Sequence, residues 1–138
     1  MAATFEHANI TVRDIHAALR FLQAALPKWQ VRYEGEGERG PWLHFGDDET
    51  YIGLDTAVEA TEGGRKPYHH TGCNHIGFVV DDLSALRERL KAAGYEEGML
   101  ALDHPHRLRA YFYDEDGIEW EFIEYLSNNP SERNDYTF

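Results

Sequence analysis

The sequence contains almost no cysteine. Of its 138 residues only Cys73 is a cysteine, so no disulfide can form within the chain. Small secreted domains commonly depend on disulfides, and this sequence does not follow that pattern. A chain of this length buries roughly two-thirds of its unfolded surface and needs no covalent cross-link to fold. We therefore expect a domain held together by a hydrophobic core.

Long hydrophobic runs and basic residues are also scarce. No apolar stretch approaches the ~20 residues of a membrane-spanning helix. The first residues, MAATFEH, lack the basic and apolar regions of a signal peptide, which predicts a cytoplasmic protein. There are 13 lysines and arginines against 25 aspartates and glutamates, a net charge of −12. This balance disfavours nucleic acid and anionic membranes as partners. The acids keep the chain soluble or attract a cationic ligand.

An internal repeat organises what the sequence does contain. HANITV at residues 7–12 aligns with HIGFVV at 75–80, an offset of 68 residues, and an aspartate follows each segment at the same distance. With the same offset, YIGL at 51–54 aligns with EWEF at 119–122. An ungapped match that preserves a histidine and an aspartate indicates that the chain is built from two copies of one unit.

Each copy predicts the element order βαβββ. Hydrophobic alternation marks the strands, and an aspartate (Asp14 or Asp82) is placed to cap the helix that follows the first strand. The predicted strands are 4–12, 29–33, 42–45 and 50–55 in the first copy, and 74–80, 97–102, 108–113 and 118–125 in the second.

These elements predict an α+β fold in a single domain, residues 1–138. It consists of module 4–56, a polar linker 57–72, module 73–126 and a polar tail 127–138. One βαβββ module leaves one face of its sheet bare. Two tandem modules can pair so that their mixed sheets form a cup, with the helices outside and a cavity inside.

Strand alternation predicts which side chains face this cavity. His7 and His75 occupy equivalent positions in the two copies, and Glu121 neighbours His75 if the first and last strands of a module pair. Two neutral imidazoles and one carboxylate form a ligand set that suits Fe(II) or Mn(II), while Zn(II), Ni(II) and Co(II) also fit. A lone strand histidine is usually not a ligand, but here two histidines recur at the repeat offset, which favours a metal site.

The segments HANITV, HIGFVV and YFYDEDGIEWEFIE resemble the vicinal oxygen chelate superfamily over about residues 5–125. That superfamily includes glyoxalase I, extradiol dioxygenases, fosfomycin-resistance transferases and bleomycin-binding proteins. The resemblance implies the paired βαβββ fold, a homodimer, a small-molecule substrate and a divalent metal held by His7, His75 and Glu121. The superfamily's fourth possible ligand falls on Gly53, which has no side chain to coordinate a metal.

Departures from the resemblance narrow the function. Glyoxalase I normally uses four protein ligands, so Gly53 argues against a standard glyoxalase. Fosfomycin transferases have a threonine where this chain has Asn9, and a serine-rich loop where it has DHPHR at 103–107, which argues against that activity too. The ring-cleaving dioxygenase signature is matched in part by His104, Tyr111 and Glu121, and a three-ligand, dioxygenase-like site is favoured.

Several further side chains are candidates for catalysis and substrate binding. Tyr111 could donate a hydrogen bond to a substrate oxygen, and His104 or His44 could move a proton near neutral pH. Alternatively, Tyr111 is a core phenol and His104 belongs to an exposed loop pair with His106. The substrate-binding candidates are Asn9, Trp42, Tyr51 and Arg109, the last of which would favour a carboxylated substrate.

Three functions stay open on the sequence alone. The first is a metal-dependent dioxygenase or lyase acting on a small molecule with vicinal oxygens. The second is a glyoxalase-type lyase or isomerase, and the third is a non-catalytic drug-binding protein of the bleomycin-resistance kind. The metal content of the purified protein would separate the enzymes from the binding protein. The ligands could come from one chain or from both chains of a swapped dimer.

Overall fold

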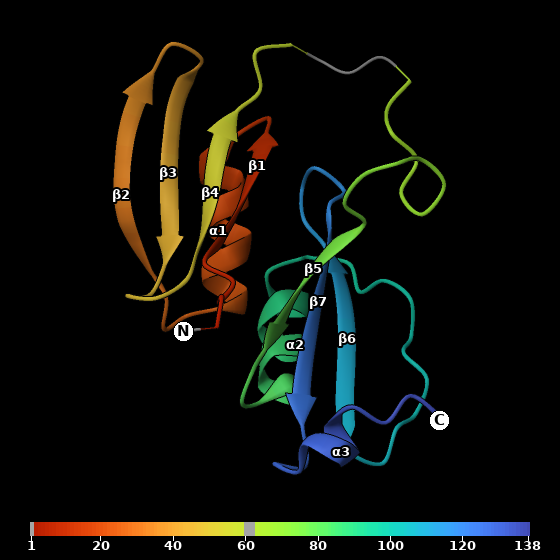
Figure 1. Ribbon diagram of the computed structural model, residues 1–138. Helices are drawn as coiled ribbons and strands as arrows, with labels where there is room; N and C mark the ends of the chain where they lie inside the picture. The colour runs from red at the N-terminus through yellow and green to blue at the C-terminus, as the bar shows by residue number, and fades with distance from the viewer. Residues whose placement is uncertain (1, 60–62) are drawn as a thin grey trace. The chain divides into compact units, whose positions relative to one another are not determined.

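The computed structural model describes residues 2–59 and 63–138, and the chain divides into two compact units (Figure 1). Unit 1 is Met1–Gly64 and unit 2 is Arg65–Phe138. Each unit packs one main helix against a small mixed sheet, which gives the α+β class that the sequence predicts. No helix in the described part of the chain is long and apolar enough to cross a membrane.

Unit 1 has a four-stranded sheet in the order β1-β4-β3-β2. Strands β1 and β4 are parallel, while β4, β3 and β2 run antiparallel to their neighbours. Helix α1 begins after Asp14, whose carboxylate accepts hydrogen bonds from the backbone N–H groups of His16 and Ala17 at 2.9 and 3.2 Å. The elements are β1 His7–Val12, α1 Ile15–Ala25, β2 Gln30–Gly37, β3 Gly40–Gly46 and β4 Tyr51–Thr56.

Unit 2 repeats this arrangement with one strand fewer, in the order β5-β7-β6. Strands β5 and β7 are parallel, and β6 is an antiparallel edge strand. Asp82 caps helix α2 by accepting a hydrogen bond from the N–H of Ala85 at 3.0 Å, the role the sequence predicts for it. The elements are β5 His75–Val79, α2 Leu83–Ala92, β6 Arg107–Tyr113, β7 Glu119–Tyr125 and a short α3 Pro130–Arg133.

The predicted strand at 97–102 does not form. Glu97 makes a single bridge to Phe112 and the N–H of Gly98 donates to the Tyr111 carbonyl, after which the chain leaves β6. A glycine gives a strand no side chain to pack, and the loop that follows Gly98 is bound to the C-terminal tail instead of to β6. The ring of His104 in that loop hydrogen-bonds the backbone carbonyl of Asp135 in the C-terminal tail, 2.9 Å away.

The strand registers follow the sequence repeat. In unit 1 His7 lies opposite Tyr51 and Asn9 opposite Gly53. In unit 2 His75 lies opposite Glu119 and Gly77 opposite Glu121, and each of these positions is 68 residues further along. The antiparallel strands differ by one position. Gly53 faces His44 and Glu121 faces Tyr111, because the turn between β6 and β7 is one residue longer than that between β3 and β4.

Each unit has its own hydrophobic core between helix and sheet. In unit 1 the fully buried residues of α1 pack over the strands, and in unit 2 α2 covers the aromatic residues of β6 and β7. The cores include Phe21, Leu22, Leu43, Phe45, Ile52 and Leu54 in unit 1, and Leu86, Leu90, Phe112, Trp120 and Phe122 in unit 2. The opposite face of each sheet carries the polar and aromatic side chains that are predicted from the sequence to form the site.

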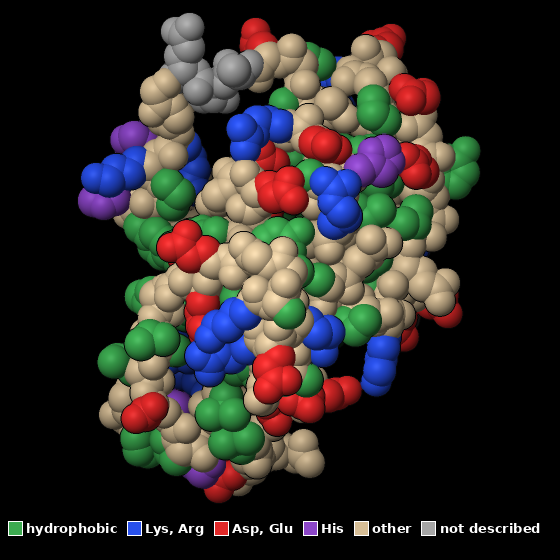
Figure 2. All heavy atoms as spheres, turned by 180° about the vertical axis from the view of Figure 1, so that it is seen from behind, with side chains coloured by type: hydrophobic (Ala, Val, Ile, Leu, Met, Phe, Trp, Pro, Cys, Tyr) green, Lys and Arg blue, Asp and Glu red, His purple; other side chains and the backbone are tan. Residues whose placement is uncertain are grey.

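The acidic residues on the face shown in Figure 2 are spread out. On the face in Figure 2, aspartates and glutamates lie among basic and hydrophobic side chains rather than in one block. A partner attracted by charge alone would therefore find no single acidic patch on this face. The high negative charge is a property of the whole chain and does not mark a binding site there.

The turn between β6 and β7 is fixed by a buried carboxylate. Asp114 accepts hydrogen bonds from the Trp120 indole at 3.0 Å and from the backbone N–H groups of Asp116 and Ile118 at 2.9 and 3.0 Å. Burial raises the pKa of Asp114 despite these bonds. In unit 1 the exposed Asp47 forms the corresponding turn, accepting from the N–H groups of Glu49 and Thr50.

We predict that Asp114→Ala is much more destabilising than Asp47→Ala. The first change leaves the buried Trp120 N–H without its acceptor and should cost about 2–4 kcal/mol of unfolding free energy. The second removes hydrogen bonds that water can replace and should cost about 1 kcal/mol or less. Urea unfolding of both variants beside the wild type measures the difference. Equal losses would show that the Asp114 network does not stabilise the core.

Candidate functional site

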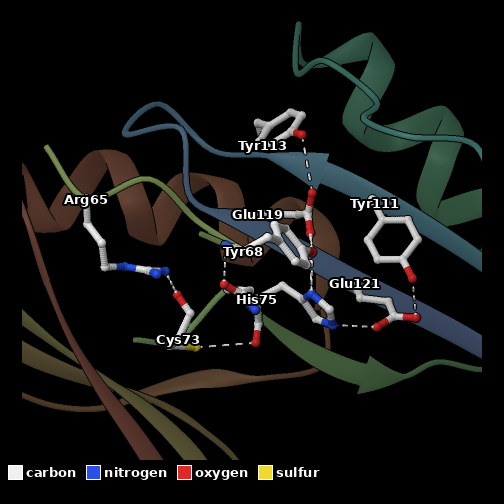
Figure 3. Close-up of polar contacts among 9 residues, drawn as sticks. Arg65, Tyr68, Cys73, His75, Tyr111, Tyr113, Glu119 and Glu121 are labelled. Atoms are coloured by element: carbon white, nitrogen blue, oxygen red, sulfur yellow. Dashed lines mark hydrogen bonds and ion pairs between the residues drawn. The ribbon is translucent and has the colours of Figure 1, made fainter. Parts of the chain in front are cut away.

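The centre of the candidate site is the imidazole of His75, which lies between two carboxylates of the neighbouring strand β7 (Figure 3). Its Nδ1 is 3.3 Å from Glu119 Oε1, and its Nε2 is 2.9 Å from Glu121 Oε2. Both glutamates are buried, with 7% and 9% of their surface exposed. Buried carboxylates need hydrogen-bonding or cationic partners, so this arrangement must be satisfied by its neighbours or by a bound ion.

Hydroxyl groups occupy the Nδ1 side of the ring. The Tyr68 hydroxyl donates to Glu119 Oε1 and lies 2.9 Å from Nδ1, while the Tyr113 hydroxyl donates to Glu119 Oε2 at 3.2 Å. Because the Tyr68 proton is directed to Glu119, the oxygen of Tyr68 can only accept from His75. These contacts place a proton on Nδ1.

The Nε2 side of the ring then requires a cation. With a proton on Nδ1, neutral His75 directs the lone pair of Nε2 toward Glu121 Oε2, and two acceptors 2.9 Å apart repel one another. Either a second proton or a metal ion relieves this. The separation of 2.9 Å is that of an N–H···O hydrogen bond, and the same two groups would also be close enough to hold one metal ion. A carboxylate that holds the other nitrogen is the usual support of a metal-binding histidine.

Tyr111 hydrogen-bonds to the second carboxylate oxygen of Glu121. Its hydroxyl donates to Glu121 Oε1 at 2.9 Å, which leaves Oε2 directed at His75. Burial and this hydrogen bond to Glu121 raise the pKa of Tyr111, so the phenol stays protonated and remains a donor at neutral pH. Tyr111 therefore contacts Glu121 beside His75, and it is largely buried; its role in catalysis stays a prediction.

Tyr68 reaches the site from the segment before β5. Its backbone has a φ of 67°, a left-handed conformation that costs a tyrosine free energy, and its N–H donates to Asn74 Oδ1 at 2.7 Å. Arg65 closes the same segment by donating to the carbonyls of His70 and Cys73. The strained backbone and these ties hold the Tyr68 hydroxyl against His75 and Glu119.

His7 is the equivalent of His75 in unit 1. Its Nδ1 is 2.8 Å from Glu6 Oε1, and its ring stacks on Tyr51 at a centroid distance of 4.7 Å and an angle of 8°. A carboxylate thus lies at Nδ1 of the first-strand histidine in both units, which favours Nε2 as the nitrogen for a ligand. The side chain of His7 is exposed.

The other predicted residues of unit 1 share one face of its sheet. Trp42, His44 and Tyr51 form a row of ring contacts, with centroid distances of 5.2 and 4.4 Å. Burial is the main cause that lowers the pKa of His44, so this ring is neutral at pH 7. Asn9 lies beside Gly53, where an added Cβ would be 2.8 Å from Asn9 Nδ2.

His104 and Arg109 lie elsewhere in unit 2. The Nε2 of His104 donates to the Asp135 carbonyl, and its Nδ1 accepts from the His106 N–H at 3.0 Å. His104 is buried rather than part of an exposed loop pair, and both of its nitrogens are already hydrogen-bonded, which suits an anchor for the tail better than a proton carrier. Arg109 lies two residues before Tyr111 on β6 and lines a cavity.

The described residues of either unit contain no group of three His, Cys, Asp or Glu side chains that meet at one point to hold a metal. In unit 2 the reason is geometric, because Glu119 and Glu121 lie on opposite sides of the His75 ring. Unit 2 by itself thus brings two candidate ligands together, His75 and Glu121. Their donor types, one imidazole and one carboxylate, fit a divalent metal.

Sequence reasoning did not single out Tyr68, Tyr113 and Glu119. Strand alternation does put Glu119 on the same face as Glu121, and a glutamate directly opposite a histidine on a parallel strand is a usable signal. Tyr68 lies in a segment expected to be a polar linker, where no periodicity indicates the direction of a side chain.

Comparison with known proteins identifies the family. A model of the Glyoxalase/Bleomycin resistance protein/Dioxygenase superfamily matches residues 4–122. The uncharacterized protein YwbC of Bacillus subtilis (strain 168) is 29% identical over 133 residues, covering 91% of this chain and 98% of YwbC.

Solved structures share the fold. A glyoxylase/bleomycin resistance protein/dioxygenase domain from Frankia sp. EAN1pec has a TM-score of 0.70 at 22% identity, covering 98% of this chain and 99% of its own. The fosfomycin resistance protein FosX from Listeria monocytogenes, complexed with Mn(II) and sulfate, has a TM-score of 0.68 at 21% identity, covering 98% and 100%. With the family model matching most of its length, the chain belongs to the Glyoxalase/Bleomycin resistance protein/Dioxygenase superfamily.

Proposed function

We propose that this protein is a metal-dependent enzyme that acts on a small substrate with vicinal oxygens, through a three-ligand site of the ring-cleaving dioxygenase kind. The observation that carries the proposal is the contact between His75 Nε2 and Glu121 Oε2 at 2.9 Å. Tyr68 and Glu119 occupy the far side of the imidazole, and Tyr111 occupies the other carboxylate oxygen. The two facing atoms are those that a divalent cation would join.

His7 is the third ligand in this proposal. Its support is the repeat, which gives His7 and His75 the same strand position, and the carboxylate that lies at Nδ1 of each ring. Fe(II) and Mn(II) suit two imidazoles and one carboxylate best, and the Listeria FosX structure contains Mn(II). Zn(II), Ni(II) and Co(II) would bind the same donors.

When bound, the metal would polarise the two substrate oxygens and lower the pKa of a coordinated hydroxyl. The residues of the chain have supporting tasks. Tyr111 orients Glu121 and can donate a hydrogen bond to a substrate oxygen, and neutral His44 can accept a proton. We assign substrate contacts to Asn9, Trp42 and Tyr51, whose row of aromatic rings suits a planar ligand.

A glyoxalase-type activity is less well supported, because the position equivalent to Glu121 is Gly53 and supplies no fourth ligand. We also propose that the protein is a cytoplasmic homodimer, since each unit is small and the exposed Cys73 is a free thiol. Sedimentation at micromolar concentration tests this, and a monomer would reject it.

Metal binding should depend on His75 and Glu121 and on the support that Tyr111 gives to Glu121. We expect His75→Ala and Glu121→Gln each to weaken Mn(II) binding at least about tenfold, and Tyr111→Phe to weaken it by about tenfold through the lost support of Glu121. Anaerobic calorimetry with Mn(II) measures these affinities.

The matched control is His16→Ala. His16 also faces a glutamate, Glu34, at 2.7 Å, but on the exposed surface of unit 1. Its replacement should leave Mn(II) affinity unchanged. If wild-type protein binds no divalent metal, or if all variants bind equally, the 2.9 Å contact is a protonated histidine pair and the enzyme proposal fails.

Gly53→Glu should convert the site from three protein ligands to four. The new side chain starts on the same face as Asn9, whose exposed amide is 2.8 Å from the added Cβ and can rotate away. We expect tighter binding of Ni(II) or Zn(II) and loss of any oxygen-dependent activity, because a position for substrate is filled.

Gly53→Ala controls for the added bulk and should leave the metal affinity as it is. If Gly53→Glu folds normally but its Ni(II) and Zn(II) affinities equal those of Gly53→Ala, Gly53 is not at the metal and the three-ligand argument loses its basis.

A further inference from the structure

A cavity in unit 2 lies along β6, the edge strand of the sheet, and has a volume of about 610 Å³. One end of α2, the loop 100–105 and the C-terminal Phe138 enclose it. Three arginines from two elements contribute to its lining, namely Arg87 on α2 and Arg107 and Arg109 on β6. Three guanidinium groups around one cavity are unusual in a chain with so few basic residues.

The hydrogen-bonding groups of these arginines are only partly paired. The Nε atom of each is enclosed by protein and has no hydrogen-bond partner. Arg87 nevertheless pairs with Glu97 at 2.8 Å, and Arg107 donates to the Arg133 carbonyl at 3.4 Å. No hydrogen bond or ion pair joins Arg109 to any residue of the described part of the chain. Arg107 also lies over the ring of Tyr136, 5.0 Å from its centroid, and both Arg107 and Arg109 are half-buried, so their guanidinium groups remain accessible to an anion.

The acidic groups at the cavity do not supply that counter-charge. Glu97 is shared by Arg87 and Lys91, at 2.8 and 2.9 Å, and these two cations neutralise it. Asp103, the other acidic side chain of the lining, is exposed on the loop, and no ion pair joins the α-carboxylate of Phe138 to an arginine in the described part of the chain. The charge that remains available is positive and is centred on Arg107 and Arg109.

The cavity wall also has apolar side chains that are open to a ligand. Leu100 and Leu102 are each 78% exposed, and Leu108 is 46% exposed. All three line the cavity together with Phe138. A hydrophobic ligand surface would remove these side chains from water, at roughly 25 cal/mol per Å² of apolar area.

We propose that this cavity binds a small organic acid, with its carboxylate on Arg109 and Arg107 and its apolar body against Leu100, Leu102 and Leu108. Arginine presents a planar pair of donors that matches a carboxylate. The proposal rests on these residues alone and does not require the metal site. Arg109 and Tyr111 lie on one face of β6, but the cavity lining does not include Tyr111, His75 or Glu121.

Hexanoate tests the proposal in metal-free protein. In ¹⁵N-labelled protein we expect hexanoate to shift the Arg109 and Arg107 Nε–H signals in a saturable way, with millimolar affinity. Acetate has the carboxylate without the long alkyl chain, and 1-hexanol has the alkyl chain without the charge. Each should bind at least about tenfold more weakly than hexanoate, a difference of about 1.4 kcal/mol in binding free energy.

Two variants locate the binding. Arg109→Gln should weaken hexanoate binding at least about tenfold, whereas Arg89→Gln, an exposed arginine of α2 outside the cavity, should leave it unchanged. Amide spectra of both variants show whether they fold. If hexanoate shifts no arginine signal, if 1-hexanol binds as tightly, or if the two folded variants bind equally, the proposal is overturned. Since the experiment contains no metal, its failure leaves the proposed enzyme function untouched.

Discussion

The candidate site depends on the imidazole of His75, which lies between the carboxylates of Glu119 and Glu121. Two buried carboxylates within hydrogen-bonding distance of one ring would repel without a positive charge between them. Tyr68 and Tyr113 satisfy Glu119, and Tyr111 satisfies one oxygen of Glu121. The remaining contact is the one between His75 Nε2 and Glu121 Oε2, at 2.9 Å. A second proton on the ring or a bound metal ion would supply a positive charge there, and we propose the metal.

The fold provides this contact through parallel pairing of the first and last strands of each unit. In unit 2 that pairing puts a histidine and two glutamates on one sheet face, while α2 covers the other face. In unit 1 the same positions carry His7, Tyr51 and Gly53, so duplication has left one unit rich in carboxylates and the other rich in aromatic rings. In the proposed function, His75 and Glu121 of unit 2 are metal ligands, and Trp42 and Tyr51 of unit 1 contact the substrate.

Much of this arrangement could be predicted from the sequence because a repeat constrains register. The offset of 68 residues predicts equivalent strand positions for His7 and His75, and pairing of the first and last strands brings Glu121 near His75. The caps Asp14 and Asp82 fix where the helices begin. The prediction of a strand at 97–102 is wrong, because hydrophobic alternation cannot show that the chain leaves the sheet after Gly98. Tyr68 could not be predicted either, because its position depends on a left-handed backbone and on contacts of the segment 65–74 rather than on any periodicity.

The central claim is that Nε2 of a histidine and a carboxylate oxygen of Glu121 bind one metal ion. Electron spin echo spectroscopy of Mn(II)-loaded protein with ¹⁵N-labelled histidine tests it most directly, because it counts the histidine nitrogens bound to the metal. We predict two coupled nitrogens in the wild type, and one in either His7→Ala or His75→Ala. Mn(II) without histidine coupling, or two couplings that persist in His75→Ala, would contradict the account.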